Sequence, residues 1–130
     1  HIEAPLLKKL EVVRVRGLET LGDIGRFPLL QALWAEDQIK LRHIALGPNP
    51  VLERLNLHTC KTLDSLPGLA TLPALRQLSA SETMLDIDAL LAQGLPASLT
   101  HARLRTGRKT RDDAIAAQLV QLGYEQARPD

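Results

Sequence analysis

The chain has 130 residues, of which 45% are hydrophobic and 24% charged, and this length suits one domain with a sizeable core. Its 16 basic and 15 acidic residues leave a formal net charge of +1, which argues against a dedicated nucleic-acid or membrane-surface protein unless charge is segregated locally. Aromatic residues make up only 2% of the chain, so we expect an aliphatic core built mainly of leucine.

The cysteine content and the absence of long apolar runs indicate the cellular compartment in which we expect the protein. Cys60 is the single cysteine, so the fold cannot depend on an internal disulfide, and a reducing compartment fits best. No apolar run reaches the length of a membrane span, and no signal peptide is visible. We therefore expect a cytoplasmic protein, with secretion as an effector left open. Because the chain begins at His1, close to a repeat boundary, we interpret it as a piece of a longer protein.

A repeat of 22 or 23 residues runs through most of the sequence, marked by prolines at Pro5, Pro28, Pro50, Pro73 and Pro96. Each proline opens a similar phrase, such as PLLKKLEV or PVLERLNL, and the phrases align in three apolar columns. The first column holds Leu7, Leu30, Leu52, Leu75 and Leu99. The second holds Leu10, Leu33, Leu55, Leu78 and Ala102, and the third Val12, Ala35, Leu57, Ala80 and Leu104. The last two columns alternate with polar residues, which predicts one strand with one buried face in each repeat.

The segments that follow these strands have a different period. Apolar residues recur every third position at Leu63, Leu66, Leu69 and Leu72, and again at Leu18, Leu21, Ile24 and Phe27. This spacing favours 3₁₀ or polyproline-like segments over an α-helix. One strand and one return segment cannot close a core alone, whereas stacked copies can.

Two stretches carry helical signals instead. Ile87, Leu90 and Leu91 have helical spacing between a capping residue, Asp86, and a stop at Gly94, which predicts a short α-helix. A second helix is predicted near the C-terminus. Thr110 and Asp113 resemble a capping box at its start, and Gly123 is expected to end it. Its apolar stripe of Ile115, Leu119 and Leu122 would cover the end of the fifth repeat.

The phrase LERLNLHTCKTL, residues 52–63, resembles the leucine-rich repeat pattern L-x-x-L-x-L-x-x-N/C-x-x-L, and the resemblance extends from residue 5 to about residue 107. It implies an α/β solenoid with a parallel β-sheet on the concave face, 3₁₀ or irregular segments and one short helix on the convex face, and a C-terminal capping helix. The repeats would occupy residues 1–109, and the capping helix and tail residues 110–130. Composition further suggests a bacterial source.

The resemblance also assigns a role to Cys60, which stands where the family has Asn or Cys. In the family that side chain lies inside the turn and hydrogen-bonds to neighbouring backbone, so we expect a structural thiol. The equivalent positions are Val15, Gln38 or Ile39, Thr83 and Gly107, and this degenerate column predicts an irregular solenoid.

Outward strand positions are the candidate binding residues, because the concave sheet face of leucine-rich repeat proteins commonly binds protein ligands. We select Trp34, Glu36, Arg54, Asn56, His58, Gln77, Ser79, His101, Arg103 and Arg105. Trp34, expected to be exposed, is either an interface anchor or a residue that packs on Arg54 and its neighbours without a partner.

No residues form a recognisable catalytic, cofactor-binding or metal-binding motif, so we expect none of these sites and no enzyme activity. His58 and Cys60 could form a metal or nucleophile site, and Asp86 with Asp88 a cation site, but a structural thiol and helix capping are the favoured interpretations. The basic stretch at residues 103–111 is interpreted as a solvated turn, with a charged part of a protein interface or a nucleic-acid site as alternatives.

These observations predict a non-catalytic module that binds an unidentified protein. The alternative is a substrate-recognition or autoinhibitory domain of a larger bacterial effector enzyme of the ubiquitin-ligase type. No capping segment precedes Leu10 and Val12, so we also expect an open edge there, where upstream repeats or a second copy would pack.

Overall fold

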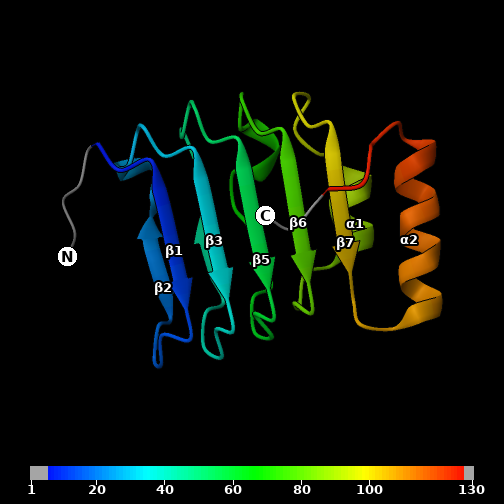
Figure 1. The fold of residues 1–130 in the computed structure, drawn as a ribbon, viewed down its shortest axis with the longest axis horizontal. Helices are drawn as coiled ribbons and strands as arrows, with labels where there is room; N and C mark the ends of the chain where they lie inside the picture. Colours follow the sequence, from blue (N-terminus) through cyan, green and yellow to red (C-terminus); the bar gives the residue numbers. More distant parts are fainter. Residues whose placement is uncertain (1–5, 128–130) are drawn as a thin grey trace.

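Five parallel strands form the main sheet of the computed structural model, which describes residues 6–127 and has a mixed α/β fold (Figure 1). The strands are β1 (Lys9–Val13), β3 (Ala32–Glu36), β5 (Arg54–His58), β6 (Gln77–Ser81) and β7 (His101–Arg105). Each strand pairs with the next in the list without a register shift, so Lys9, Ala32, Arg54, Gln77 and His101 form one row. The strands and the register predicted from the apolar columns are confirmed. Pro5, the first proline of the series, and the end of the tail at residues 128–130 lie outside the described residues.

The core lies behind this sheet, where the inward side chains of neighbouring strands stack on one another. The fully buried leucines of the repeat columns are Leu30, Leu33, Leu52, Leu55, Leu57, Leu75 and Leu78. On β1, the equivalent Leu10 and Val12 are only half-buried and pack on the core from one side. Among the described residues, β1 is the outermost strand of the sheet, on the side where the sequence predicts an open edge.

The return segments form a second layer behind the main sheet, partly as predicted. Short 3₁₀ segments occur at η1 (Ile24–Arg26) and η2 (Leu69–Thr71), and the leucines spaced by three around η2 are buried. The sequence did not predict β2 (Thr20–Asp23) and β4 (His43–Ala45), which pair in parallel as a separate two-stranded sheet. These strands form because stacking brings two return segments side by side, and a three-residue period in one segment carries no trace of that pairing.

The turns after four strands share one backbone conformation, in which a non-glycine residue takes a positive φ. These residues are Arg14, Asp37, Thr59 and Glu82, with φ values of 51°, 58°, 53° and 53°. The next residue of two turns is fully buried, namely Gln38 and Cys60. Gln38 rather than Ile39 therefore occupies the position equivalent to Cys60, because Ile39 is 61% exposed.

The predicted short helix is present as α1 (Ile87–Gln93), and its capping residue is confirmed. Asp86 Oδ1 accepts a hydrogen bond from the Ala89 amide at 3.1 Å, and the helix ends at Gly94 with φ of 95°. α1 lies behind β7 on the side toward α2, on the same side of the sheet as the other return segments (Figure 1).

The second helix, α2 (Lys109–Gln121), packs against β7 at the end of the sheet, but two details of its prediction are wrong (Figure 1). Thr110 is not the N-cap, since the helix begins one residue earlier. Ile115 and Leu119 are buried as expected, whereas Leu122 is 54% exposed because it follows the last helical turn.

A carboxylate near the start of α2 replaces the missing capping side chain. Asp112 accepts hydrogen bonds from the Thr106 amide at 2.6 Å, the Thr106 hydroxyl at 2.8 Å and the Gly107 amide at 3.1 Å. Slight desolvation opposes ionisation, but these bonds and the charge of Arg105 outweigh it and hold the pKa of Asp112 below its ordinary value. Asp112 thereby ties the end of β7 to the first turn of α2.

Gly68→Ala should destabilise the fold more than Gly17→Ala. Both glycines have a positive φ, of 87° and 77°, so each substitution brings a conformational cost of about 1–2 kcal/mol. A Cβ at Gly68 would also collide with the backbone oxygen of Leu46, whereas a Cβ at Gly17 meets nothing within 4 Å. We expect urea unfolding to show an additional loss of about 2 kcal/mol for Gly68→Ala. Equal losses would mean that the backbone at Leu46 moves freely.

Asp112→Asn should lower stability at neutral pH by about 1–2 kcal/mol, because it removes a charge-assisted acceptor. Since the pKa of Asp112 is lower in the folded state, its contribution is present above about pH 4 and disappears as pH falls through the folded pKa. Urea titrations at several pH values measure this difference. Asp113→Asn is the matched control: Asp113 is exposed and forms a solvated ion pair with Lys109 at 3.0 Å, so the change should alter stability by less than about 0.5 kcal/mol. If both variants lost the same unfolding free energy at every pH, the stabilising role assigned to Asp112 would be wrong.

Candidate functional site

The outward face of the main sheet carries all the candidate binding residues, because they alternate with buried residues along each strand. β3 contributes Trp34 and Glu36, β5 contributes Arg54, Asn56 and His58, β6 contributes Gln77 and Ser79, and β7 contributes His101, Arg103 and Arg105. The parallel register brings them together as three rows that cross the sheet.

Their exposure differs from the expectation for a fully solvated face. Asn56 and Ser79 were selected as accessible, but only 3% and 1% of their surfaces are exposed. Both are short side chains in the central rows and strands, where the longer side chains around them exclude solvent. Arg54 and Arg105 are exposed, and the other candidates are half-buried.

Trp34 is half-buried and is held by its neighbours rather than projecting freely. Its indole Nε1 donates a hydrogen bond to Glu36 Oε1 at 2.9 Å, and its ring lies 4.9 Å from the ring of His58, measured between centroids. Next to it is a hollow of about 230 Å³ lined by Lys9, Glu11, Ala32, Leu33, Trp34, Arg54 and Asn56. The indole therefore forms one wall of a concavity on the sheet face.

His58 connects Trp34 to the centre of the face. Its Nδ1 lies 2.8 Å from the Ser81 hydroxyl. Burial lowers the pKa of His58, Glu36 opposes this effect, and Arg103 adds to it. The imidazole is therefore neutral at neutral pH, with one nitrogen donating and the other accepting.

Several buried polar atoms of this face lack a hydrogen-bond partner among residues 6–127. They are Asn56 Oδ1, His58 Nε2, Ser79 Oγ and Arg103 Nε. Buried polar side chains are nearly always paired, so four such atoms on three adjacent strands are unusual. Sequence reasoning selected these residues as outward positions, but the lack of partners becomes visible only in the folded structure.

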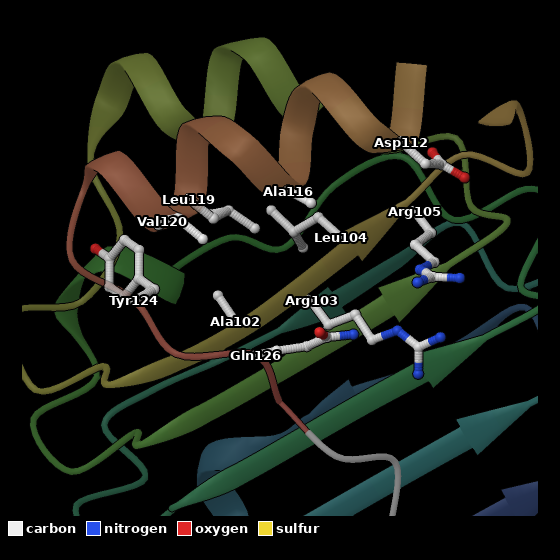
Figure 2. Close-up of a pocket in the computed structure, with 10 residues that line it drawn as sticks. All are labelled: Ala102, Arg103, Leu104, Arg105, Asp112, Ala116, Leu119, Val120, Tyr124 and Gln126. Carbon is white, nitrogen blue, oxygen red and sulfur yellow. The ribbon is translucent and has the colours of Figure 1, made fainter. Parts of the chain in front are cut away.

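A smaller pocket lies between β7 and α2 (Figure 2). Ala102, Leu104, Ala116, Leu119 and Val120 line its apolar part, and its volume is about 60 Å³. Ligand pockets are usually several times larger, so this space is a packing gap beside the helix. Figure 2 also shows Arg103 and Arg105 extending over the sheet face, with Gln126 next to Arg103.

The basic stretch at residues 103–111 does not form one continuous charged surface. Lys109 pairs with Asp113 at 3.0 Å, and Arg111 pairs with Asp88 of α1 at 2.6 Å. The charges are therefore divided among the sheet face, the exposed Arg108 and two local ion pairs, which argues against a nucleic-acid site.

Cys60 lies inside its turn, as the family resemblance implies. It is fully buried, and its thiol donates to the backbone oxygens of Ala35 and His58, each at 3.6 Å. Burial raises the pKa of Cys60 to about 11, so the thiol is protonated at neutral pH and is a poor nucleophile. His58 projects from the outward face instead, and the two residues form no joint site.

Within residues 6–127, no group of three or more His, Cys, Asp and Glu side chains is arranged to hold a metal ion. Asp86 caps α1 and Asp88 pairs with Arg111, so neither is left for a cation site. No helix in this part of the chain is long and apolar enough to cross a membrane. No protein-family model matches the chain, and no curated protein and no solved structure matches it either.

The Cys60 thiol should resist a water-soluble disulfide reagent at about pH 8 in the native protein and react rapidly in urea, because only unfolding exposes it and lowers its pKa. We expect native labelling at least about 100-fold slower than labelling of the unfolded chain, followed by absorbance of the released thiolate. Fast native labelling would place the thiol at the surface and contradict a structural role.

Proposed function

We propose that this chain is a leucine-rich repeat solenoid that binds a protein partner through the outward, concave face of its main sheet and performs no catalysis of its own. The in-register strands, the three-residue spacing behind them and the buried thiol after β5 support the family. α2 acts as the cap of the last repeat, because Ile115 and Leu119 are buried against it. The single buried thiol suits a reducing, cytoplasmic location.

The observation that carries the binding function is the combination of Trp34 with the hollow beside it. Tryptophan and arginine are the side chains most often found at the energetic centre of protein interfaces. Here the indole is pre-positioned by Glu36 and His58, so little side-chain entropy is lost when a partner packs on it. Arg54 is exposed on β5, the strand beside β3 in the sheet. It lines the same hollow and adds a flexible cation.

The composition of the face favours a protein over a small molecule or a nucleic acid. Aromatic, cationic, acidic and amide groups are all present across the sheet. The row that contains Lys9, Arg54 and His101 carries basic groups only, whereas the other two outward rows each combine an acidic side chain with an arginine. A mixed surface of this kind complements a folded protein or an extended peptide, whose groups are equally mixed.

A Trp34→Ala, Arg54→Ala double variant should lose the partner that wild type captures. Truncating two residues at the centre of the interface should weaken binding by at least about 30-fold. The measurement is a pull-down from source-cell lysate read by mass spectrometry, followed by titration of the captured protein in purified form.

An Ile39→Ala, Lys40→Ala double variant is the matched control, since it removes one apolar and one cationic side chain from exposed turn positions. It should retain the partner, and both variants must show a wild-type circular dichroism spectrum. Retention of the partner by the Trp34 and Arg54 variant would place the interface elsewhere and refute the proposal.

A further inference from the structure

Three buried and unpaired polar atoms lie on adjacent strands near the middle of the sheet face. They are His58 Nε2, Ser79 Oγ and Arg103 Nε, contributed by β5, β6 and β7. Ser79 and Arg103 are direct partners in the register, and His58 lies one row further along the neighbouring strand. Since adjacent strands are about 4.8 Å apart, one small group placed over Ser79 can reach all three side chains.

These atoms can all donate hydrogen bonds to the same group. The Arg103 guanidinium has only donors, and the Ser79 hydroxyl rotates to donate where an acceptor is offered. His58 Nε2 carries the ring proton when Nδ1 accepts from the Ser81 hydroxyl, which is 2.8 Å away. Asn56, in the same row as Ser79, presents its amide nitrogen after a rotation of its terminal group. The arrangement therefore suits an acceptor, such as an oxyanion.

The charge at this point matches a single negative charge. Arg105 acts on Asp112, and Lys109 and Arg111 have their own ion pairs. Arg103 has no carboxylate partner within residues 6–127. The nearby Glu36 contributes a negative charge that acts on His58, so the surroundings oppose a doubly charged phosphate more than a carboxylate.

We propose that His58, Ser79 and Arg103 form a carboxylate-binding subsite that receives an aspartate or glutamate side chain of the protein partner. This inference rests on the proposed protein-binding function and adds the chemistry that the partner must present. Ser79 is the decisive residue: it is 1% exposed and unpaired, so the site is built into the sheet rather than spread over a solvated surface.

Acetate is the probe that tests the subsite, observed by two-dimensional NMR of the full chain at constant ionic strength. We expect saturable shifts centred on Ser79, Arg103 and the His58 ring. Inorganic phosphate in a parallel titration should bind more weakly, and chloride should produce no localised shifts. Arg103→Gln should weaken acetate binding by about tenfold, because it removes the charged donor.

Arg76→Gln is the matched control, since it removes the same charge from an exposed position directly before β6 that is not among the candidate binding residues, and it should change acetate affinity by less than about twofold. Both variants must retain the wild-type melting temperature within a few degrees. If Arg103→Gln is unstable, Ser79→Ala replaces it, because it removes one donor while leaving the charge.

The His58 ring provides a second readout. A carboxylate at Nε2 favours the imidazolium, so acetate should raise the pKa of His58. The charged groups that act on this ring are Glu36 from β3 and Arg103 from β7, and both remain in place in the Arg76→Gln control. A ring that titrates identically with and without acetate would contradict a contact at Nε2.

Three NMR results would overturn the subsite: no acetate-induced shifts, shifts spread over the whole surface, or equal shifts in Arg103→Gln and wild type. Tighter binding of phosphate than of acetate would overturn it as well. These results are distinguishable from failure of the proposed function. If acetate does not bind but the Trp34 and Arg54 variant loses its partner, protein binding stands and the subsite is wrong. If acetate binds as expected but that variant keeps its partner, an anion site exists and its assignment to a partner side chain fails.

Discussion

The in-register stacking of parallel strands is the constraint on which the rest of this structure depends. Leu55 pairs with Leu33 on one side and with Leu78 on the other, and all three are fully buried. A single repeat would leave these leucines exposed, because its strand and return segment are too short to enclose them. The same register sets the outward rows, so the core and the candidate binding face are two consequences of one alignment.

The turns transmit this register from one repeat to the next. Thr59 has a positive φ of 53° and donates its amide to Ser81 of the next strand at 2.8 Å, which extends the ladder beyond β5. The chain then turns inward, and Cys60 satisfies its weak donor with two backbone oxygens. A thiol is small and largely apolar, so it can occupy this interior without the desolvation cost of a charged group.

The two ends of the main sheet differ in how their end strands are covered. At one end α2 buries Ile115 and Leu119, and Asp112 fastens the helix to the loop that follows β7. At the other end Leu10 and Val12 are half-buried, since within residues 6–127 β1 pairs with a strand on one side only. Among the described residues, β1 is therefore the edge strand of the main sheet, opposite the end that α2 covers.

The amino-acid sequence by itself determined the strands, their register, the positions of both helices and the rows of the outward face. It could do so because leucine at a constant interval, in alternation with polar residues, fits only one stacking of the strands. The tertiary structure alone decided the pairing of β2 with β4, the choice of Gln38 over Ile39 and the use of Asp112 in place of Thr110. Each of these depends on neighbours that are about one repeat apart or on the exact start of a helix, neither of which a local pattern records. The burial of Asn56 and Ser79 has the same origin: alternation places them outward, but only the long side chains of adjacent strands decide that water does not reach them.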